Sequence, residues 1–532
     1  MSANDWAATI IESLVVQGVS DFFIAPGSRC TPLVLAAAHH TKTQTYTHFD
    51  ERGLGFYALG WMQCNKRPAA IIVTSGTAVG NLLPAIMEAH QSRLPLIVLT
   101  ADRPPELRVS GANQTTNQPH IFEPWTHFNT DLLCEGSAFA NELHSLCVHA
   151  VFRSKEGPIH LNLMFRGPFT DEALTYPKLT PISYSPSLPV VVEEISFPEK
   201  GVILIGRTCE DLSPIYSLSE RLGWPIFADF LSQNRTSPHP NCIHFYEEFF
   251  TDEIEFVFQF GDRFISKKLL QWLEMKRPEH VLILDHEKYH DPSHTVTRRI
   301  TASIGAFCNV FSDLSPREND WLASFQKQDQ DYFEQVQTLF ENANATEPYF
   351  FWSLAQNPAL ENALLFIGNS MPIRNADHFF HPQKKPQAIF ANRGVSGIDG
   401  NIATIAGIAT NRENPVIGII GDQAALHDLN SLALLQKCPN CTLIIINNQG
   451  GAIFSYLPIS SSKHFEEYFF NPHAFDFSSI AQQFHLPYRA ITSFEDFPLE
   501  PGIIEVCTNK ERDQQVLQQI KQRFQDVAQV RI

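Results

Sequence analysis

An acidic residue directly follows an apolar stretch in the C-terminal third of the chain. Residues 416–420 (VIGII) are typical of a buried strand, and Gly421 and Asp422 come immediately after them. Burying a bare carboxylate is costly unless it is paired or binds a metal ion. Asp422 therefore needs a partner, and the segment that supplies it should lie at the same end of the strand.

A second polar segment, Asn447-Asn448-Gln449-Gly450-Gly451, follows after one predicted helix and one predicted strand. Because parallel strands present their carboxyl ends at one sheet edge, we expect it to lie near Asp422. A carboxylate, an amide oxygen and a backbone carbonyl suit Mg²⁺, with phosphate oxygens completing the shell, and a helix N-terminus after Asp422 favours the same phosphates. The residues alone leave open a plain helix cap and a turn asparagine.

The composition is that of a soluble globular protein with several domains. The chain has 532 residues, 44% of them hydrophobic, and a formal net charge of −18. A chain of this length is too long to fold around a single hydrophobic core. Its excess of acidic residues argues against nucleic-acid binding. We find no run of about eighteen apolar residues and no basic-then-apolar N-terminus, so no membrane span or secretory signal is expected. The ten cysteines are interpreted as reduced thiols in the cytoplasm.

Strands and helices alternate along most of the chain, which is typical of parallel sheets covered by helices. In the first 170 residues the predicted strands are 21–25, 45–49, 69–74 and 95–101, and the predicted helices include 5–17, 51–64 and 78–90. Later strands are predicted at 201–206, 225–230, 254–261, 280–285, 363–368, 387–392, 416–421 and 442–447, with a helix at 319–344. The proline-rich stretch 171–200 is interpreted as a linker.

This alternation predicts an α/β protein of three domains, each with a parallel sheet flanked by helices. We expect the domains to span residues 1–180, 181–345 and 346–532, and the first and third share their alternation. We find no clear glycine-rich fingerprint for a dinucleotide in residues 201–345, so no flavin is expected there.

Gly421-Asp422 with Asn447-Asn448 resembles the metal–diphosphate motif of thiamine diphosphate enzymes, with Gln423 where the usual Gly-Asp-Gly has its second glycine. The resemblance implies the thiamine diphosphate-binding fold, with residues 1–180 binding the pyrimidine and residues 346–532 the diphosphate. It implies Mg²⁺ or Mn²⁺ held by Asp422, Asn448 and the carbonyl of Gly450. It also implies a cofactor held between two subunits, hence at least a homodimer, with a homotetramer usual.

Glu51, in the stretch THFDERGLGFYALG (47–60), is the catalytic glutamate that this resemblance implies. A carboxyl group that hydrogen-bonds the pyrimidine ring promotes loss of the thiazolium C2 proton, and the cofactor then accepts electrons as CO₂ leaves. Taken alone, Glu51 is equally an acidic residue in the first turn of a helix, where the helix dipole favours it.

Several longer stretches resemble one family of these enzymes, the 2-succinyl-5-enolpyruvyl-6-hydroxy-3-cyclohexene-1-carboxylate synthases of menaquinone or phylloquinone biosynthesis. They include APGSRCTPL (25–33), TADRPPELRVSGANQT (100–115), GNSMPIRNAD (368–377) and NRGVSGIDGNIATIAG (392–407). The resemblance implies decarboxylation of 2-oxoglutarate and 1,4-addition of the succinyl carbanion equivalent to isochorismate. The alternatives are another thiamine diphosphate-dependent 2-oxo acid decarboxylase, an acetolactate synthase-like carboligase, and a non-catalytic binding protein of the same fold.

Both implied substrates are dianions, which an acidic protein must attract with locally concentrated cations. Arginine suits carboxylates because its planar fork binds two oxygens. The residues expected to bind substrate are Ser28, Arg29, Arg103, Gln114, Lys267, Lys268, Arg374, Arg393, Ile453, Phe454 and Leu457, and those expected to bind cofactor also include Ser370, Asn392, Ile398 and Gly421. The family has Lys-Arg where this chain has Lys267-Lys268, and two helical lysines are otherwise a solvated face. The three apolar residues after Gly451 could instead be core packing.

Overall fold

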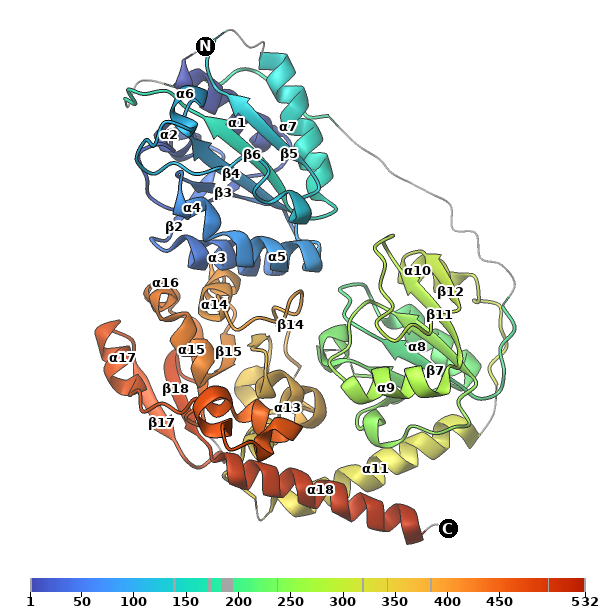
Figure 1. Ribbon diagram of the computed structural model, residues 1–532. Coiled ribbons are helices and arrows are strands. Elements are labelled where there is room, and N and C mark those ends of the chain that lie inside the picture. Colours follow the sequence, from blue (N-terminus) through green and yellow to red (C-terminus); the bar gives the residue numbers. More distant parts are fainter. Residues whose placement is uncertain are drawn as a thin grey trace.

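The computed structural model of the chain has three α/β domains, each built on a six-stranded parallel sheet (Figure 1). It describes residues 2–136, 140–170, 174–182, 195–236, 238–317, 320–341, 343–382, 385–495 and 497–530. The fold class expected from the sequence is confirmed. Residues 171–173 and 183–194 of the expected linker lie outside the described residues.

The first domain contains the sheet β2-β1-β3-β4-β6-β5. Its strands are β1 (Asp21–Ile24), β2 (Gln44–Thr47), β3 (Ala69–Val73), β4 (Leu96–Asp102), β5 (Asn129–Leu133) and β6 (Ile159–Met164). Its helices are α1 (Ala3–Val16), α2 (Thr31–His39), α3 (Glu51–Asn65), α4 (Thr77–Gly80), α5 (Leu83–Ser92), α6 (Pro105–Arg108) and α7 (Ala140–Ser154).

The middle domain contains the sheet β12-β11-β10-β7-β8-β9, the strand order of dinucleotide-binding folds read from the other edge. Its strands are β7 (Gly201–Ile205), β8 (Ile226–Ala228), β9 (Cys242–Ile243), β10 (Phe256–Phe260), β11 (Glu279–Leu284) and β12 (Arg298–Thr301). Its helices are α8 (Ser213–Leu222), α9 (Lys267–Lys276), α10 (Ile304–Asn309) and the long α11 (Asp320–Phe340).

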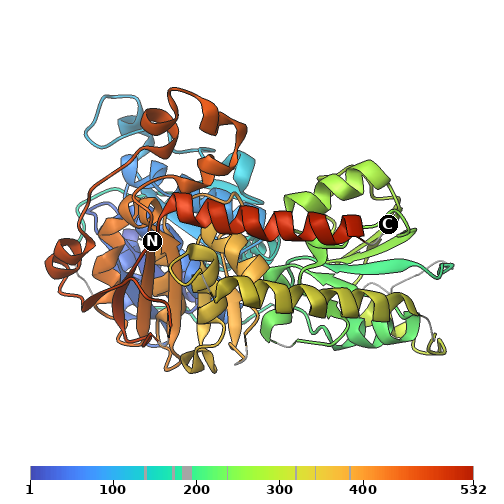
Figure 2. The same cartoon turned by 90° about the horizontal axis from the view of Figure 1, so that it is seen from below.

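The third domain contains the sheet β14-β13-β15-β16-β18-β17, which repeats the strand order of the first domain. Its strands are β13 (Leu364–Ile367), β14 (Ala388–Phe390), β15 (Val416–Gly421), β16 (Cys441–Asn447), β17 (Tyr488–Ile491) and β18 (Gly502–Cys507). Its helices are α12 (Glu347–Leu354), α13 (Met371–Phe379), α14 (Asn401–Ala409), α15 (Asp422–His427), α16 (Leu432–Leu435), α17 (Phe477–Gln483) and α18 (Lys510–Val530). Figure 2 shows α11 and α18 extending beside the middle domain.

The helix predicted at 78–90 was wrong in one respect, because the structure has two helices there. Pro84 lies in the first turn of α5, after a break that follows α4. Proline is well tolerated in a first turn, where its missing N–H would have no helical partner, but it breaks a helix interior. The short α4 therefore remains a separate turn. It lies at the carboxyl ends of the strands of the first sheet, the side that we call the ligand edge of a sheet.

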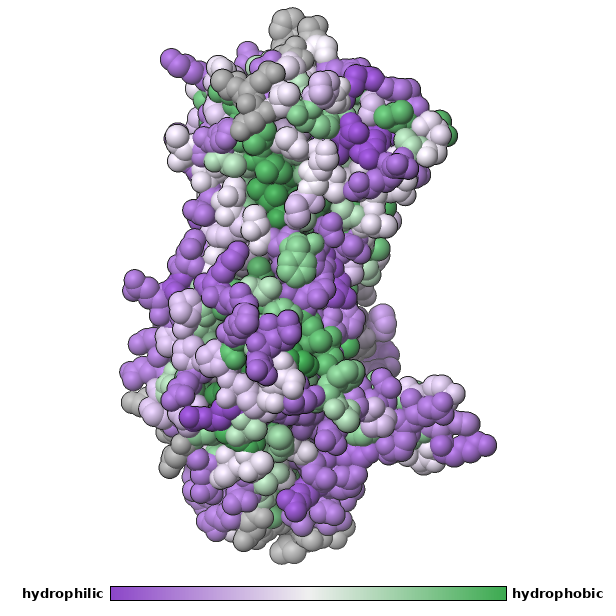
Figure 3. Space-filling view, turned by 90° about the vertical axis from the view of Figure 1, so that its left-hand side faces the viewer, coloured by the Kyte–Doolittle hydropathy of each residue, from purple (hydrophilic) through white to green (hydrophobic). Residues whose placement is uncertain are grey.

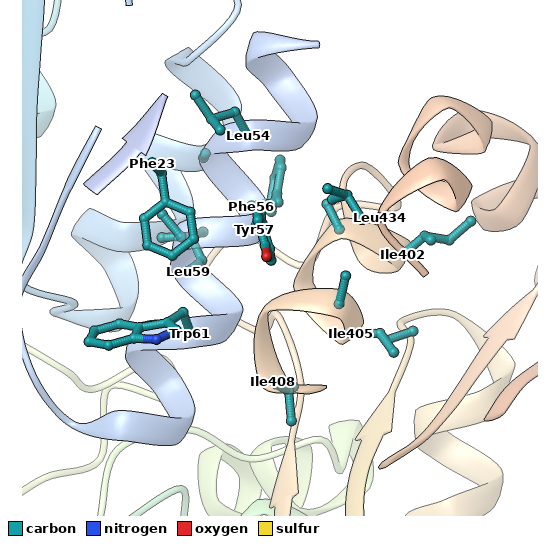
Figure 4. Close-up of a cluster of buried hydrophobic side chains, with 14 of the residues drawn as sticks. Phe23, Leu54, Phe56, Tyr57, Leu59, Trp61, Ile402, Ile405, Ile408 and Leu434 are labelled. Atoms are coloured by element: carbon teal, nitrogen blue, oxygen red, sulfur yellow. The ribbon is translucent and has the colours of Figure 1, made fainter. Parts of the chain in front are cut away.

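Two glycines allow the first and third domains to pack closely. A Cβ atom on Gly60 of α3 would lie 2.0 Å from the Thr404 carbonyl oxygen, and one on Gly407 of α14 would lie 2.2 Å from the Tyr57 carbonyl oxygen. Around this crossing, apolar side chains of both domains form one buried cluster that includes Phe56 and Ile405 (Figure 4). The two domains therefore share a core, and the start of α3 is fixed against the third domain.

The surface is polar over most of the face shown in Figure 3, with apolar residues interspersed where the first and third domains meet. The described part of the chain contains no helix with an apolar stretch sufficient to cross a membrane.

Candidate active site

Asp422 and the asparagine segment lie at one edge of the third sheet. The strands β15 and β16 are parallel, with Gly421 aligned to Ile446, so residues 422 and 447–450 follow neighbouring strand ends. Asp422 Oδ2 accepts a hydrogen bond from the Gly450 N–H at 3.0 Å, and Asp422 Oδ1 accepts one from the Gln423 N–H at 2.6 Å. The structure thus brings together the two segments whose spacing predicted a common site.

The side-chain oxygen atoms at this edge are suitable ligands for a cation. Asp422 is only 2% exposed, and within the described residues the buried Oδ1 of Asn448 has no hydrogen-bond partner. A buried oxygen without a partner is costly, and it is the type of ligand that Mg²⁺ prefers. Burial raises the pKa of Asp422, although the N–H groups of Gln423 and Gly450 and the nearby His473 oppose this.

His473 is a neighbour of Asp422 that the sequence did not reveal. Its Nε2 lies 3.2 Å from Asp422 Oδ2, and its backbone N–H donates to the Gln449 carbonyl at 3.1 Å. No motif surrounds His473 in the sequence, so only the three-dimensional structure links it to this site.

Glu51 is the first residue of α3, which Asp50 caps by accepting hydrogen bonds from the Arg52 and Gly53 N–H groups. Asn81 Nδ2 lies 3.4 Å from Glu51 Oε2, and Arg52 Nη2 donates to the His427 carbonyl at 2.8 Å. The start of α3 therefore contacts the end of α15, the helix that Asp422 begins. The hydrogen bonds found in the described part of the chain do not join Glu51 to Asp422.

Arg29 and Arg103 form a pair at the ligand edge of the first sheet. Arg103 follows β4 directly and donates to Ser75 Oγ at 3.1 Å and to the Asn113 carbonyl at 2.8 Å. Arg29 donates to the Phe165 carbonyl at 2.9 Å, and burial together with the charge of Arg103 lowers the pKa of Arg29. Two neighbouring guanidinium groups favour an anion between or beside them.

Gln114 belongs to the same group, and Ser28 precedes Arg29 in the loop after β1. Gln114 Nε2 donates to the Ser75 carbonyl at 3.1 Å, and Ser75 Oγ donates to the Gln114 carbonyl at 2.9 Å. The Ser28 carbonyl accepts a hydrogen bond from Thr31 Oγ1 at 2.8 Å. Ser75, which contacts both Arg103 and Gln114, was not singled out from the sequence.

Arg374 and Arg393 form a second pair, at the ligand edge of the third sheet. Arg374 lies on α13 and donates to the Ser370 carbonyl, while Arg393 Nη1 donates to Asn369 Oδ1 at 2.9 Å. Burial and the charge of Arg393 lower the pKa of Arg374. Ser370 itself has a left-handed backbone conformation (φ 74°) at the N-cap of α13.

Asn392 lies beside Arg393 and is hydrogen-bonded to both the first and the third domain. Its Oδ1 accepts a hydrogen bond from Gln63 of the first domain at 2.9 Å, and its Nδ2 donates to Thr404 Oγ1 at 2.8 Å. Its side chain is 2% exposed. Asn392 therefore joins the first domain to the wall of the candidate site.

Lys268 makes ion pairs within the middle domain. Its Nζ lies 2.7 Å from Glu248 Oε1 and 3.7 Å from Glu247 Oε2. Burial favours the neutral amine, but the two carboxylates outweigh it and raise the pKa of Lys268. Both glutamates also lie close to His378 on α13, the helix that carries Arg374. Lys267 and Lys268 are both exposed.

The apolar candidates remain partly accessible. Ile398 is 38% exposed and Leu457 is 44% exposed, while Ile453 and Phe454 are half-buried. The Phe454 ring packs edge-on against Phe469 at 5.9 Å between ring centroids. Exposed apolar side chains beside charged ones suit a surface that a ligand or another subunit covers.

Models of three thiamine pyrophosphate enzyme domains match the chain in order. The N-terminal binding domain matches residues 4–121, the middle domain residues 194–367 and the C-terminal binding domain residues 370–508. These matches include strands of all three parallel sheets, with β5 and β6 of the first sheet outside them, and they contain Glu51, Asp422 and the four arginines described above.

Three relatives match nearly the whole chain, and each is named 2-succinyl-5-enolpyruvyl-6-hydroxy-3-cyclohexene-1-carboxylate synthase. The protein of Rubrobacter xylanophilus is 34% identical over 95% of this chain and 95% of its own length. That of Salinibacter ruber is 34% identical (96% and 95%), and that of Chloroflexus aurantiacus is 36% identical (96% and 94%). The chain therefore belongs to the 2-succinyl-5-enolpyruvyl-6-hydroxy-3-cyclohexene-1-carboxylate synthase family of thiamine pyrophosphate enzymes.

Proposed function

We propose that this protein decarboxylates 2-oxoglutarate and adds the remaining succinyl unit 1,4 to isochorismate, in menaquinone or phylloquinone biosynthesis. One carbon–carbon bond breaks as CO₂ leaves, and another forms to the ring. Two dianionic substrates give a trianionic product and neutral CO₂, so one proton is taken up. Full-length similarity to relatives that carry the synthase name supports this function, and the alternative carboligases are not favoured.

The observation that carries the proposal is the contact between Asp422 and Gly450 beside the unpartnered oxygen of Asn448. We assign these residues, with the Gly450 carbonyl, to a Mg²⁺ or Mn²⁺ ion that holds the cofactor diphosphate, and Gly421 to the same turn. Thiamine diphosphate, when bound, supplies the electron sink that lets a 2-oxo acid lose CO₂. Ser370, Asn392 and Ile398 would form the wall on which it lies.

Glu51 is proposed to hold a proton at the pyrimidine ring of a cofactor bound mainly by a second copy of this chain. Phe49, two residues earlier, is 59% exposed, and a hollow of about 590 Å³ beside it is lined by apolar residues such as Ile24, Val34 and Leu434. Exposed apolar surface of this kind is often covered by another subunit. We therefore propose at least a homodimer, and a homotetramer as the full assembly.

The two arginine pairs are proposed to bind the carboxylates of 2-oxoglutarate and isochorismate, Arg29 and Arg103 from the first domain and Arg374 and Arg393 from the third. Because each pair lies at a ligand edge, a partner subunit could bring the two edges together over one cofactor. Ser28, Gln114 and Lys267 would add hydrogen bonds. Lys268 would give up its ion pair with a glutamate and bind a substrate carboxylate instead. Ile453, Phe454 and Leu457 would exclude water from the reacting carbon.

The expected domain limits remain a prediction, with divisions after residues 180 and 345. The second division falls between α11, which ends at Phe340, and α12, which begins at Glu347. We also propose a cytoplasmic location, since all ten cysteines are free thiols, as in a reducing compartment.

The deciding experiment compares turnover of the purified protein on 2-oxoglutarate with and without isochorismate, and on pyruvate. With Mg²⁺ and thiamine diphosphate present, we expect CO₂ release from 2-oxoglutarate. We expect the trianionic coupled product only when isochorismate is added. Turnover of pyruvate in preference to 2-oxoglutarate would favour the carboligase alternative. Failure to bind thiamine diphosphate with Mg²⁺ in calorimetry would leave only a non-catalytic binding protein.

A further inference from the structure

The loop between β14 and α14 carries two residues of the candidate site, Arg393 and Ile398, yet other domains hold its backbone. Glu88 of α5, in the first domain, is 1% exposed. Its Oε1 accepts a hydrogen bond from the Gly394 N–H at 2.6 Å, and its Oε2 accepts one from the Val395 N–H at 2.7 Å. A single buried carboxylate thus binds two successive backbone amides next to Arg393.

The middle domain holds the carbonyl groups of the same loop. Arg263 Nη1 donates to the carbonyls of Arg393 at 3.1 Å and Gly394 at 2.8 Å. Arg263 Nη2 donates to Gln91 Oε1 of the first domain at 3.2 Å. The peptide groups around Gly394 therefore have their N–H side fixed by one domain and their carbonyl side fixed by another.

The fit at Gly394 leaves no space for movement toward α5. A Cβ atom at this position would lie 2.6 Å from Glu88 Oε1 and 2.7 Å from the Glu88 carbonyl oxygen. On the other side of the loop, Asn369 Nδ2 donates to the Gly397 carbonyl at 2.7 Å while its Oδ1 accepts from Arg393. The direction of the Arg393 side chain thus depends on where Glu88 and Arg263 hold the backbone.

We propose that Glu88 and Arg263 are positioning residues that present Arg393 and Ile398 to the substrates and cofactor. This inference rests on the function proposed above for those two residues. We call Glu88 and Arg263 together the clamp. Hydrogen bonds to charged groups are stronger than neutral ones, so the clamp restrains the loop more than neutral side chains would. Ser92 Oγ donates to Glu88 Oε1 at 2.8 Å and keeps the carboxylate oriented.

The test compares Glu88→Gln and Arg263→Lys with the control Arg93→Gln. Glutamine turns an amide N–H₂ toward one backbone N–H, and lysine loses the fork that joins the loop to Gln91. Arg93 also links the first and middle domains, through Asp285 at 2.9 Å, but among the described residues its side chain does not hydrogen-bond the loop. The readouts are amide hydrogen exchange of residues 392–400 and the KM and kcat for each substrate.

We expect both clamp variants, but not Arg93→Gln, to speed exchange of the Gly394 and Val395 amides about tenfold. The KM for at least one dianionic substrate should rise about tenfold, with a smaller change in kcat. In an Arg393→Met background, the same clamp substitution should add less than about twofold, because coupled residues act on one step.

Unchanged exchange in both clamp variants would overturn the inference, as would a full additional rise in KM in the Arg393→Met background. If Glu88→Gln does not fold, Arg263→Lys decides by the same readouts. A parent protein that does not turn over 2-oxoglutarate with isochorismate would instead count against the proposed function. The exchange measurement would still decide whether Glu88 and Arg263 hold the loop.

Discussion

Glu347 should make the stability of the protein fall as the pH rises through neutrality. Its side chain is 2% exposed at the start of α12, and its backbone N–H donates to Asp513 Oδ1 of α18 at 2.8 Å. Burial, and then the neighbouring carboxylate of Asp513, raise the pKa of Glu347 to about 8. Burial also raises the pKa of Asp513. The folded pair therefore retains a proton at pH values where both groups are ionised in the unfolded chain.

The sign follows from which state binds more protons. Between about pH 5 and pH 8 the folded state holds roughly one proton more than the unfolded state, so raising the pH favours unfolding. One proton corresponds to about 1.4 kcal/mol per pH unit, or about 3 kcal/mol between pH 5.5 and 7.5. Glutamine at position 347 keeps the shape of the side chain but does not titrate, and this part of the pH dependence should disappear.

Urea-induced unfolding of the parent and Glu347→Gln, followed by tryptophan fluorescence at pH 5.5, 6.5 and 7.5, measures this difference. The matched control is Glu341→Gln, the same substitution at an exposed position near the end of α11. We expect the free energy of unfolding of Glu347→Gln to increase relative to that of the parent as the pH rises. For the control, the difference from the parent should not change with pH. Parallel profiles for the parent and Glu347→Gln would refute the reasoning.

Three further outcomes follow from the site and the domain contact. Asp422→Asn should weaken Mg²⁺-supported binding of thiamine diphosphate at least tenfold in calorimetry, because a charged buried ligand is lost; binding equal to the parent would contradict the assigned metal site. Glu51→Gln should bind the cofactor but lose more than about a hundredfold in turnover of 2-oxoglutarate with isochorismate. Gly407→Ala should lower the free energy of unfolding by about 3 kcal/mol or more, because its Cβ would meet the Tyr57 carbonyl at 2.2 Å; an unchanged urea midpoint would show that α3 and α14 can separate freely.

Most inner strands of the three sheets could be predicted from the sequence, with β6 and β18 as exceptions, and most edge strands could not. Strands such as β15 and β16 are continuous apolar runs because helices cover both faces. The missed β5 and β17 lie at sheet edges and most of their residues are only half-buried, so their sequences NTDLL and YRAI lack that pattern. The missed β6 is buried, but His160 and Asn162 interrupt its apolar run and hydrogen-bond Thr100.

The candidate site was predictable where its residues follow strand ends inside a recognisable motif. Asp422 and Asn448 meet this condition, and so do the four arginines. Glu88 does not, because it lies in the interior of a helix, more than three hundred residues before the loop that it holds. Its contact partners are backbone N–H groups, which carry no sequence signal.

The middle domain contributes to the site through the edge of its sheet at which related folds bind nucleotides. Ligands of such sheets lie beyond the carboxyl ends of the strands. Here the segment after β10 supplies Arg263 to the Arg393 loop, and the Phe230 N–H after β8 donates to Asp377 Oδ1 of α13 at 2.9 Å. After β11, Lys288 Nζ donates to Gln91 Oε1 at 2.9 Å. Because the contacts of Arg263 and Phe230 reach the two elements that carry the second arginine pair, substitutions beside these contacts should alter substrate binding although neither residue touches a substrate.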